Sequence, residues 1–276
     1  MGKVLFVPFF PGELGWEIIN YVPHVNYLCS QEQYDEIHVM VREGREALYP
    51  MGTHFYPIRI ISDSSMGNSG IKPSISIRSS IKSVMNSKLQ GILADEVSIP
   101  PHGCQLFSDR KFLKYEASAL LLNKWDYLPQ NSVTLLVRGR TFGPHKNWES
   151  TNWVSLCHFL LDKSLIPIIV GIKGNTIFKI PAGCIDLQNK TTLGDLLAIF
   201  KKTQFTIGQS TGTAHFASLA GIPHLIWGSS RIAKRYLRSW NPHNTFVKYL
   251  SCKNEFDCSI NEVCQVIEDY LQSLSV

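Results

Sequence analysis

The stretch Ile207-Gly-Gln-Ser-Thr-Gly-Thr-Ala-His215, which continues into Phe216-Ala-Ser-Leu-Ala-Gly-Ile-Pro223, decides the fold. It predicts a short buried strand, a tight turn of small residues and an Ala-rich helix. A strand that leads directly into a helix is the repeating unit of a parallel α/β sheet. The N–H groups at such a helix start attract anions, and Ser210, Thr211 and Thr213 add hydroxyl groups. A capping role for Ser210 or Thr211 is the alternative interpretation.

The same alternation extends in both directions from this stretch. Its apolar runs predict strands, and its amphipathic runs predict helices, with Ser150 or Thr151 capping the first of them. The predicted strands of this half are 133–137, 165–170, 184–187, 205–207 and 224–227, and its predicted helices are 151–163, 192–202, 210–220 and 261–273. This order predicts a parallel sheet with helices on both faces.

The first half begins in the same way but is less regular. It has predicted strands at 4–7, 36–41 and 58–61, predicted helices at 16–29 and 112–125, and a Ser/Gly-rich loop at 62–87. Pro129-Gln-Asn-Ser132 marks the predicted boundary. The chain is therefore expected to form two Rossmann-like domains, 1–130 and 131–276, and the N-terminal one to be reduced.

Composition excludes several classes of protein. With 44% hydrophobic and 18% charged residues among 276, the chain is neither disordered nor fibrous. Its apolar runs fall far short of the ~20 residues of a membrane helix, and its start does not resemble a signal peptide. A cytoplasmic location is expected. Seven scattered cysteines predict reduced thiols, and Cys252, Cys258 and Cys264 lack the C-x-x-C spacing of a zinc site.

The charge balance indicates anionic ligands without choosing among them. The net charge of +5 suits phosphates, acidic glycans and nucleic acid alike. The densest basic cluster, Arg231, Lys234, Arg235 and Arg238, has helical spacing, and it is either a solvated helix surface or an anion-binding face.

The second half resembles the ADP-heptose–lipopolysaccharide heptosyltransferase family, whose fold is the two-domain GT-B type. The resemblance covers about 132–229 and rests on several motifs in the family's order. Arg138-Gly-Arg-Thr-Phe-Gly-Pro-His-Lys146-Asn-Trp148 resembles the loop after the first strand. Thr192-Leu-Gly-Asp-Leu-Leu-Ala198 resembles its T-x-L-x-E-L helix. Gly208-Gln-Ser-Thr-Gly-Thr-Ala-His215 resembles G-x-D-[ST]-G-x-x-H, with Ser210 where the family has Asp.

The resemblance also implies where substrates bind. Lys146 matches a residue that contacts the donor's phosphates, and Gly171 opens the loop that lines the nucleotide. The remaining candidate donor-binding residues are Arg138, Gln209, Ser210, Thr211, Gly212, Thr213 and His215. Arg138 pairing with a local carboxylate and His215 packing within the helix are the alternatives. Trp148 and Trp153 are expected to pack.

Gly12-Glu13 resembles the family's G-D turn, and Glu13 is the expected general base for the acceptor hydroxyl. A helix-start glutamate is its structural alternative. The sequence has no D-x-D metal pair, no P-loop and no G-x-G-x-x-G fingerprint. Neither a metal nor a cofactor is therefore expected.

The expected function is an inverting, metal-independent glycosyltransferase of hexosyl or heptosyl type. It would move a sugar from a nucleotide-diphosphate sugar to a glycan or glycolipid hydroxyl, with the leaving diphosphate neutralised by the helix start and Lys146. Two alternatives stay open: a transferase acting on modified DNA bases, and a non-catalytic protein that binds nucleotide sugars.

Overall fold

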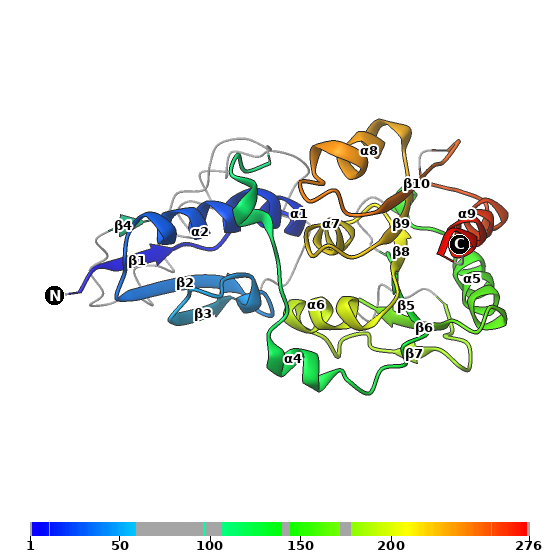
Figure 1. Cartoon of the computed structure of the whole chain (residues 1–276), viewed down its shortest axis with the longest axis horizontal. Helices are drawn as coiled ribbons and strands as arrows, with labels where there is room; N and C mark the ends of the chain where they lie inside the picture. The colour runs from blue at the N-terminus through cyan, green and yellow to red at the C-terminus, as the bar shows by residue number, and fades with distance from the viewer. Residues whose placement is uncertain are drawn as a thin grey trace. The chain divides into compact units, whose positions relative to one another are not determined.

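The computed structural model describes residues 2–10, 12–58, 96–97, 106–139, 144–171, 178–254 and 256–274. The chain divides into two compact units, Met1–Leu113 and Lys114–Val276 (Figure 1). The Ser/Gly-rich loop predicted at 62–87 and most of the strand predicted at 58–61 lie outside the described residues. In the described part, no helix has the length and apolar character to cross a membrane.

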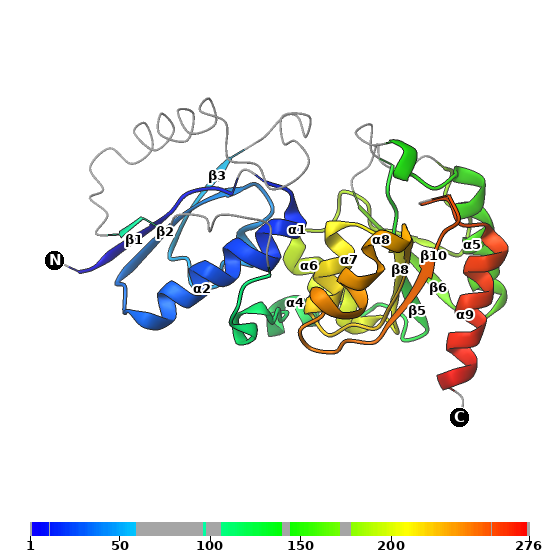
Figure 2. The same cartoon turned by 90° about the horizontal axis from the view of Figure 1, so that it is seen from above.

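The first unit contains a parallel sheet in the order β3-β2-β1-β4. Its elements are β1 (Val4–Val7), α1 (Leu14–Trp16), η1 (Glu17–Tyr21), α2 (Val22–Gln31), β2 (Glu36–Arg42), η2 (Glu46–Leu48), β3 (His54–Ile58), β4 (Glu96–Val97) and η4 (Arg110–Leu113). Figure 2 shows α2 lying along one face of β1 and β2. The predicted helix 16–29 is longer, because α1, the π-helical η1 and α2 follow one another without a break.

The second unit contains a six-stranded sheet in the order β10-β9-β8-β5-β6-β7, and all of its pairings are parallel. Its strands are β5 (Ser132–Leu136), β6 (Ile166–Val170), β7 (Ile185–Asp186), β8 (Thr206–Gln209), β9 (His224–Gly228) and β10 (Val247–Ser251). Its helices are α4 (Ala119–Lys124), η5 (Pro144–Lys146), α5 (Ser150–Asp162), α6 (Leu193–Lys202), α7 (Gly212–Leu219), α8 (Ser230–Lys234), η6 (Arg235–Ser239) and α9 (Ile260–Leu274). The predicted strand–helix alternation of this half is confirmed.

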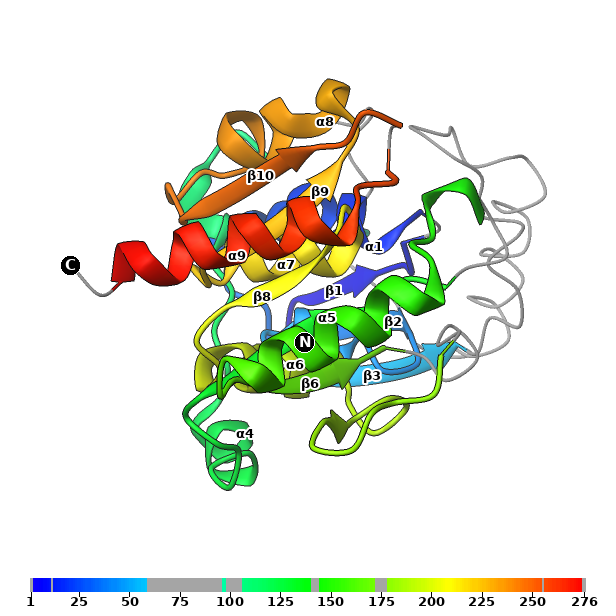
Figure 3. The ribbon, with the colours of Figure 1, turned by 90° about the vertical axis from the view of Figure 1, so that its right-hand side faces the viewer.

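Helices cover both faces of this second sheet. Figures 1 and 3 show α5 and α9 together on one face, and Figure 1 shows α6 and α7 on the other. The α5–α9 side holds a large apolar core in which Trp148, Trp153 and Trp227 pack with ring centroids 4.7–5.6 Å apart. The predicted packing role of Trp148 and Trp153 is thus confirmed.

The boundary between the units lies at Leu113, so the boundary expected at residue 130 falls inside the second unit. The end of α4 is tied to α6 of the same unit. The buried carboxylate of Asp195 on α6 accepts hydrogen bonds from Lys124 Nζ (2.7 Å) and Trp125 Nε1 (2.8 Å). Asp195 also completes a capping box with Thr192. The end of α4 belongs to the second unit, because the polar groups of Lys124 and Trp125 donate hydrogen bonds to an acidic residue of α6.

Two local predictions were wrong. The helix predicted over 112–125 is interrupted, because Ser118 is extended and caps a new helix by accepting the N–H of Leu121 (3.4 Å). Helix α5 begins at Ser150 after the N-cap residue Glu149, whose side chain makes no capping hydrogen bond. Neither Ser150 nor Thr151 is its cap.

Candidate functional site

The predicted donor-binding residues follow the carboxyl ends of β5, β6 and β8 in the second unit. These strands run parallel, so their carboxyl ends meet at one edge of the sheet, where ligands of α/β sheets bind. Arg138 follows β5, Gly171 follows β6, and the turn 210–213 joins β8 to α7. Gly208 permits the close approach of β8 to β5, since a Cβ there would lie 2.7 Å from Leu136 Cβ.

The start of α7 has both a cap and free donors. Thr211 is its extended N-cap, and its Oγ1 accepts the N–H of Ala214 (3.2 Å) and lies 2.8 Å from Thr213 Oγ1. The backbone N–H groups of Gly212 and Thr213 donate to no residue that the structure describes. The capping interpretation is therefore confirmed for Thr211, and the two N–H groups remain available to an anion.

Ser210 is held in place by two neighbours. Its backbone N–H donates to the carbonyl of Trp227 (3.1 Å), and its Oγ accepts a hydrogen bond from Tyr236 Oη (2.9 Å). Tyr236 is fully buried, and this burial raises the pKa of its phenol well above the ordinary value. The phenol therefore stays protonated, and while it donates to Ser210 Oγ the Ser210 hydroxyl keeps its own proton for another acceptor.

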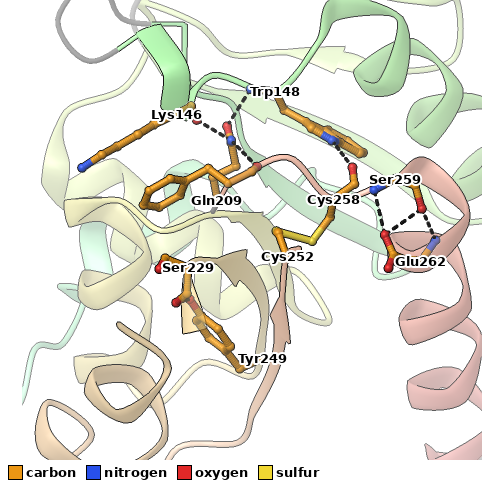
Figure 4. The surroundings of a disulfide bond; sticks show 10 residues. Lys146, Trp148, Gln209, Ser229, Tyr249, Cys252, Cys258, Ser259 and Glu262 are labelled. Atoms are coloured by element: carbon orange, nitrogen blue, oxygen red, sulfur yellow. Dashed lines mark hydrogen bonds between the residues drawn. A yellow bond between two sulfur atoms is a disulfide. The ribbon is translucent and has the colours of Figure 1, made fainter. Parts of the chain in front are cut away.

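Gln209 has a structural task that the sequence did not reveal. Its fully buried carboxamide accepts the N–H of Trp148 (3.2 Å) and donates to the carbonyls of Lys146 and Phe256. Figure 4 shows this side chain between the two segments. Its partners are 47 to 63 residues away in sequence. Gln209 therefore fastens the loop of Lys146 to the end of β8.

Lys146 presents a cation beside this anchor. Its backbone carbonyl is bound by Gln209, and its Nζ lies 5.0 Å from the ring centroid of Phe256. The ammonium group makes no ion pair or hydrogen bond with any residue in the described ranges. A half-buried lysine in this state is suited to an anionic ligand.

Arg138 and Gly171 differ in their surroundings. Arg138 is buried, 7% exposed, and its guanidinium donates to Oδ1 of Asn147, the residue after Lys146. Gly171 is exposed, has a φ of +139° and accepts the N–H of Asn189 (2.9 Å). The rest of the loop predicted to line the nucleotide, 172–174, lies outside the described residues.

His215 packs inside the protein. Its ring stacks on Tyr236 at 4.1 Å and lies 4.6 Å from Trp240. Burial, with the charges of His224 and Arg235, lowers the pKa of His215 to about 3. The side chain is therefore neutral at pH 7 and offers no positive charge to a phosphate. Of the two predicted roles, the structure favours helix packing.

A disulfide borders the anchor of Gln209 (Figure 4). The prediction that all cysteines are reduced was wrong for Cys252 and Cys258, whose Cα atoms lie 4.8 Å apart and whose Sγ atoms are bonded. The turn that they close contains Phe256, and the carbonyl of Cys258 accepts the indole N–H of Trp148 (2.7 Å). The closed turn thus supplies two of the backbone carbonyls that hold the Lys146 segment.

In the first unit, Glu13 is the N-cap residue of α1. Its backbone carbonyl accepts the N–H groups of Trp16 (3.0 Å) and Glu17 (3.1 Å). Its half-buried carboxylate makes no hydrogen bond or ion pair with the described residues. The side chain is therefore available for proton transfer, as a general base requires.

The next glutamate along the helix was not singled out from the sequence. Glu17 is 1% exposed, accepts a hydrogen bond from Tyr49 Oη (2.9 Å) and pairs with Arg45. It lies at the start of the π-helical turn η1. A glutamate between apolar neighbours is the sequence signal of such a buried pair.

The chain resembles solved structures of glycosyltransferases. The chain resembles the E. coli ADP-heptose LPS heptosyltransferase II with a TM-score of 0.63 at 12% identity, over 99% of this chain and 100% of that one. It resembles the glycosyl transferase family 9 protein of Veillonella parvula with a TM-score of 0.61 at 12% identity, over 98% and 97% of the two chains.

A third structure, the E. coli heptosyltransferase WaaC with ADP, gives a TM-score of 0.57 at 15% identity, over 97% and 99% of the two chains. No family model and no curated protein sequence matches the chain. These likenesses confirm the α/β fold of GT-B type that the motifs of the second half predicted.

Proposed function

We propose that the chain is a glycosyltransferase that moves a sugar from a nucleotide-diphosphate sugar to a hydroxyl of a glycan or glycolipid. The observation that supports it is the combination of a donor-rich helix start with a lysine ammonium that has no ion-pair partner in the described part of the chain. The Lys146 ammonium makes no ion pair or hydrogen bond with the described residues, and its backbone is fastened to Gln209, the residue just before the turn 210–213. The fold is shared with transferases whose structures are named for ADP-heptose and ADP.

The donor's diphosphate is the group that this arrangement fits. Two backbone N–H groups at the start of α7 and the Ser210 hydroxyl offer hydrogen bonds to phosphate oxygens. The Lys146 ammonium supplies positive charge as the leaving diphosphate gains negative charge. We propose that these groups replace a metal ion, and that the transfer inverts the anomeric centre.

Glu13 is the proposed general base. A carboxylate that is not engaged by other side chains can accept the proton of an attacking hydroxyl. Removing such a base costs roughly 10²–10⁴-fold in rate. The Glu13→Gln variant is therefore expected to lower kcat by about that factor while donor binding is unchanged.

Donor binding is tested by thermal shift with ADP-, GDP-, UDP-, dTDP- and CMP-sugars. EDTA is present in every sample, and the reference is the melting temperature of the protein with EDTA alone. One nucleotide class is expected to raise the melting temperature, because a ligand of the native state stabilises it. Lys146→Ala should abolish the shift, and Lys248→Ala, an exposed lysine on the edge strand β10, should keep it. Equal shifts in both variants would remove Lys146 from the donor site.

Turnover is tested with the donor so identified. Release of nucleoside diphosphate is measured with water, a lipid-linked glycan and duplex DNA as acceptors. Acceptor-dependent release with the glycan supports the proposal, and release only with DNA moves the acceptor to nucleic acid. Donor binding without release in any arm identifies a protein that binds nucleotide sugars without transferring them.

A further inference from the structure

Three metal-ligating side chains lie together in the first unit, at the amino ends of β2 and β3. Glu36 and His38 are two residues apart on β2 and so point to the same face of the sheet. His54, the first residue of the edge strand β3, pairs with His38 in the strand register. The pairing is held by Thr53, which exchanges backbone and side-chain hydrogen bonds with Ile37 at 2.8–3.2 Å.

The three side chains offer ligand atoms within reach of one ion. Glu36 Oε2 lies 2.8 Å from His38 Nε2 and 3.8 Å from His54 Nε2, and all of these atoms lie within 4.8 Å of one another. Ligand atoms about 2.0–2.2 Å from a tetrahedral Zn²⁺ ion are roughly 3.3–3.6 Å apart. The spacing here therefore needs only a small adjustment. His54, half exposed and stacked on His38 at 4.5 Å, is free to turn its Nε2 toward the ion.

His38 has the surroundings of a metal ligand. Its side chain is 5% exposed, and its second ring nitrogen, Nδ1, lies 2.8 Å from Tyr56 Oη. Without an ion, Nε2 carries the proton that it donates to Glu36 Oε2 at 2.8 Å. A bound cation takes the place of that proton, and Nδ1 then donates to the Tyr56 hydroxyl while the lone pair of Nε2 faces the ion. Histidine ligands usually have such an outer partner, which fixes the ring and its tautomer. The cluster is thus oriented by a neighbouring residue of β3.

We propose that Glu36, His38 and His54 bind one Zn²⁺ ion, with water completing its coordination. Two imidazoles and a carboxylate suit Zn²⁺ and related first-row divalent ions, whereas Mg²⁺ and Ca²⁺ prefer oxygen ligands alone. The site lies at the amino ends of the strands, opposite to the edge where ligands of α/β sheets react. The ion links the edge strand β3 to β2.

The test is a calorimetric titration of the full-length protein with ZnCl₂ after EDTA treatment and removal of the chelator. The wild type is expected to bind one equivalent that Mg²⁺ does not displace, with a rise in melting temperature. Glu36→Gln and His54→Ala change half-exposed side chains, and each should weaken binding at least tenfold. His158→Ala, an exposed histidine on α5, should bind as the wild type does.

Co²⁺ distinguishes this site from the thiols of the chain. The Co²⁺ complex is expected to show nitrogen and oxygen ligation without a thiolate charge-transfer band, and the His54→Ala variant should lose its spectrum. Absence of Zn²⁺ binding, unchanged binding in both variants or a thiolate band would each overturn the proposal. This test does not use the donor-binding and turnover assays. A negative result for the Zn²⁺ site therefore leaves the proposed glycosyltransferase function untouched, and the reverse also holds.

Discussion

The Tyr236 hydroxyl donates a 2.9 Å hydrogen bond to Ser210 Oγ, and this bond joins the π-helical turn η6 to the residue before the α7 cap. Ser210 stands where the heptosyltransferase motif has an aspartate. An aspartate there would bring a negative charge toward the place proposed for the diphosphate. The serine offers a neutral hydroxyl instead, in an orientation that a buried phenol sets.

Tyr236→Phe is expected to weaken donor binding and to destabilise the protein. Removal of the phenol leaves Ser210 without its donor, at a cost of about 1 kcal/mol in the free energy of unfolding. Tyr249→Phe is the matched control, since it removes a hydrogen bond of 2.8 Å to the carbonyl of Ser229. Urea denaturation should show similar losses for both, and calorimetry should show weaker nucleotide-sugar binding for Tyr236→Phe alone. Equal donor affinity in the two variants would contradict the role of Ser210.

Gln209→Glu is expected to loosen the Lys146 segment. The carboxylate still accepts the N–H of Trp148 but repels the carbonyl oxygens of Lys146 and Phe256, to which the amide donated. A buried group left without its partner costs about 1–3 kcal/mol. The free energy of unfolding, measured in urea, should fall by that amount, and KM for the donor should rise. An unchanged KM would show that the position of Lys146 does not depend on this amide.

Gly208→Ala is expected to destabilise the second unit. The added Cβ would lie 2.7 Å from Leu136 Cβ and 2.9 Å from Leu136 O, and a backbone oxygen cannot turn aside as the end of a flexible side chain can. Overpacking of this kind costs about 1–3 kcal/mol. The unfolding midpoint in urea should therefore fall. A midpoint equal to that of the wild type would refute the close approach of β8 and β5.

The disulfide is expected to contribute about 2 kcal/mol, because it closes only the short turn between Cys252 and Cys258. Dithiothreitol should lower the melting temperature of the wild type. The Cys252→Ser/Cys258→Ser double variant should melt at this lower temperature with or without the reductant. If dithiothreitol also lowers the melting temperature of the double variant, its effect does not come from this bond.

Two buried histidines are expected to make stability depend on pH. Burial lowers the pKa of His215 to about 3 and that of His224 to about 4, while in the unfolded chain both titrate near 6.5. The unfolded chain therefore binds more protons as the pH falls below 6.5, and stability is lost in the same direction. Each histidine contributes a slope of at most about 1.4 kcal/mol per pH unit between its two pKa values.

The measurement is urea denaturation at pH 7.5, 6 and 5 for the wild type and His215→Phe. The phenylalanine keeps the stacking on Tyr236 but cannot take up a proton. Its free energy of unfolding should fall less steeply with acidification. Identical slopes in the two proteins would show that His215 is not the source.

The sequence predicted the second sheet well, because its strands are short apolar runs and parallel strands are buried on both faces. It missed β10, whose residues Val247–Ser251 are half buried or exposed at the sheet edge and therefore lack that signal. The pairing of Cys252 with Cys258 was also missed. A disulfide requires the two Cα atoms to be close, here 4.8 Å apart, and the spacing of the cysteines in sequence does not predict that distance.

The sequence predicted which residues form the candidate site, but not the contacts that hold them in place. The helix start at 211–213 and the cation Lys146 follow from motif and residue type. The anchoring by Gln209 joins segments up to 63 residues apart, so only the folded chain shows it. The burial of His215 depends in the same way on Tyr236 and Trp240, which come from a later segment.

The all-parallel second sheet has a consequence for how the chain folds. A parallel pair cannot form through a tight hairpin, so each pairing has to close a loop that contains an intervening segment. The central pair is the most demanding, since Thr134 pairs with Thr206 and the whole of β6, β7 and α6 lies between them. Such non-local pairing slows folding and leaves unpaired strand edges exposed for longer. Refolding in the laboratory should therefore succeed best from dilute solution, where two incomplete sheets seldom meet.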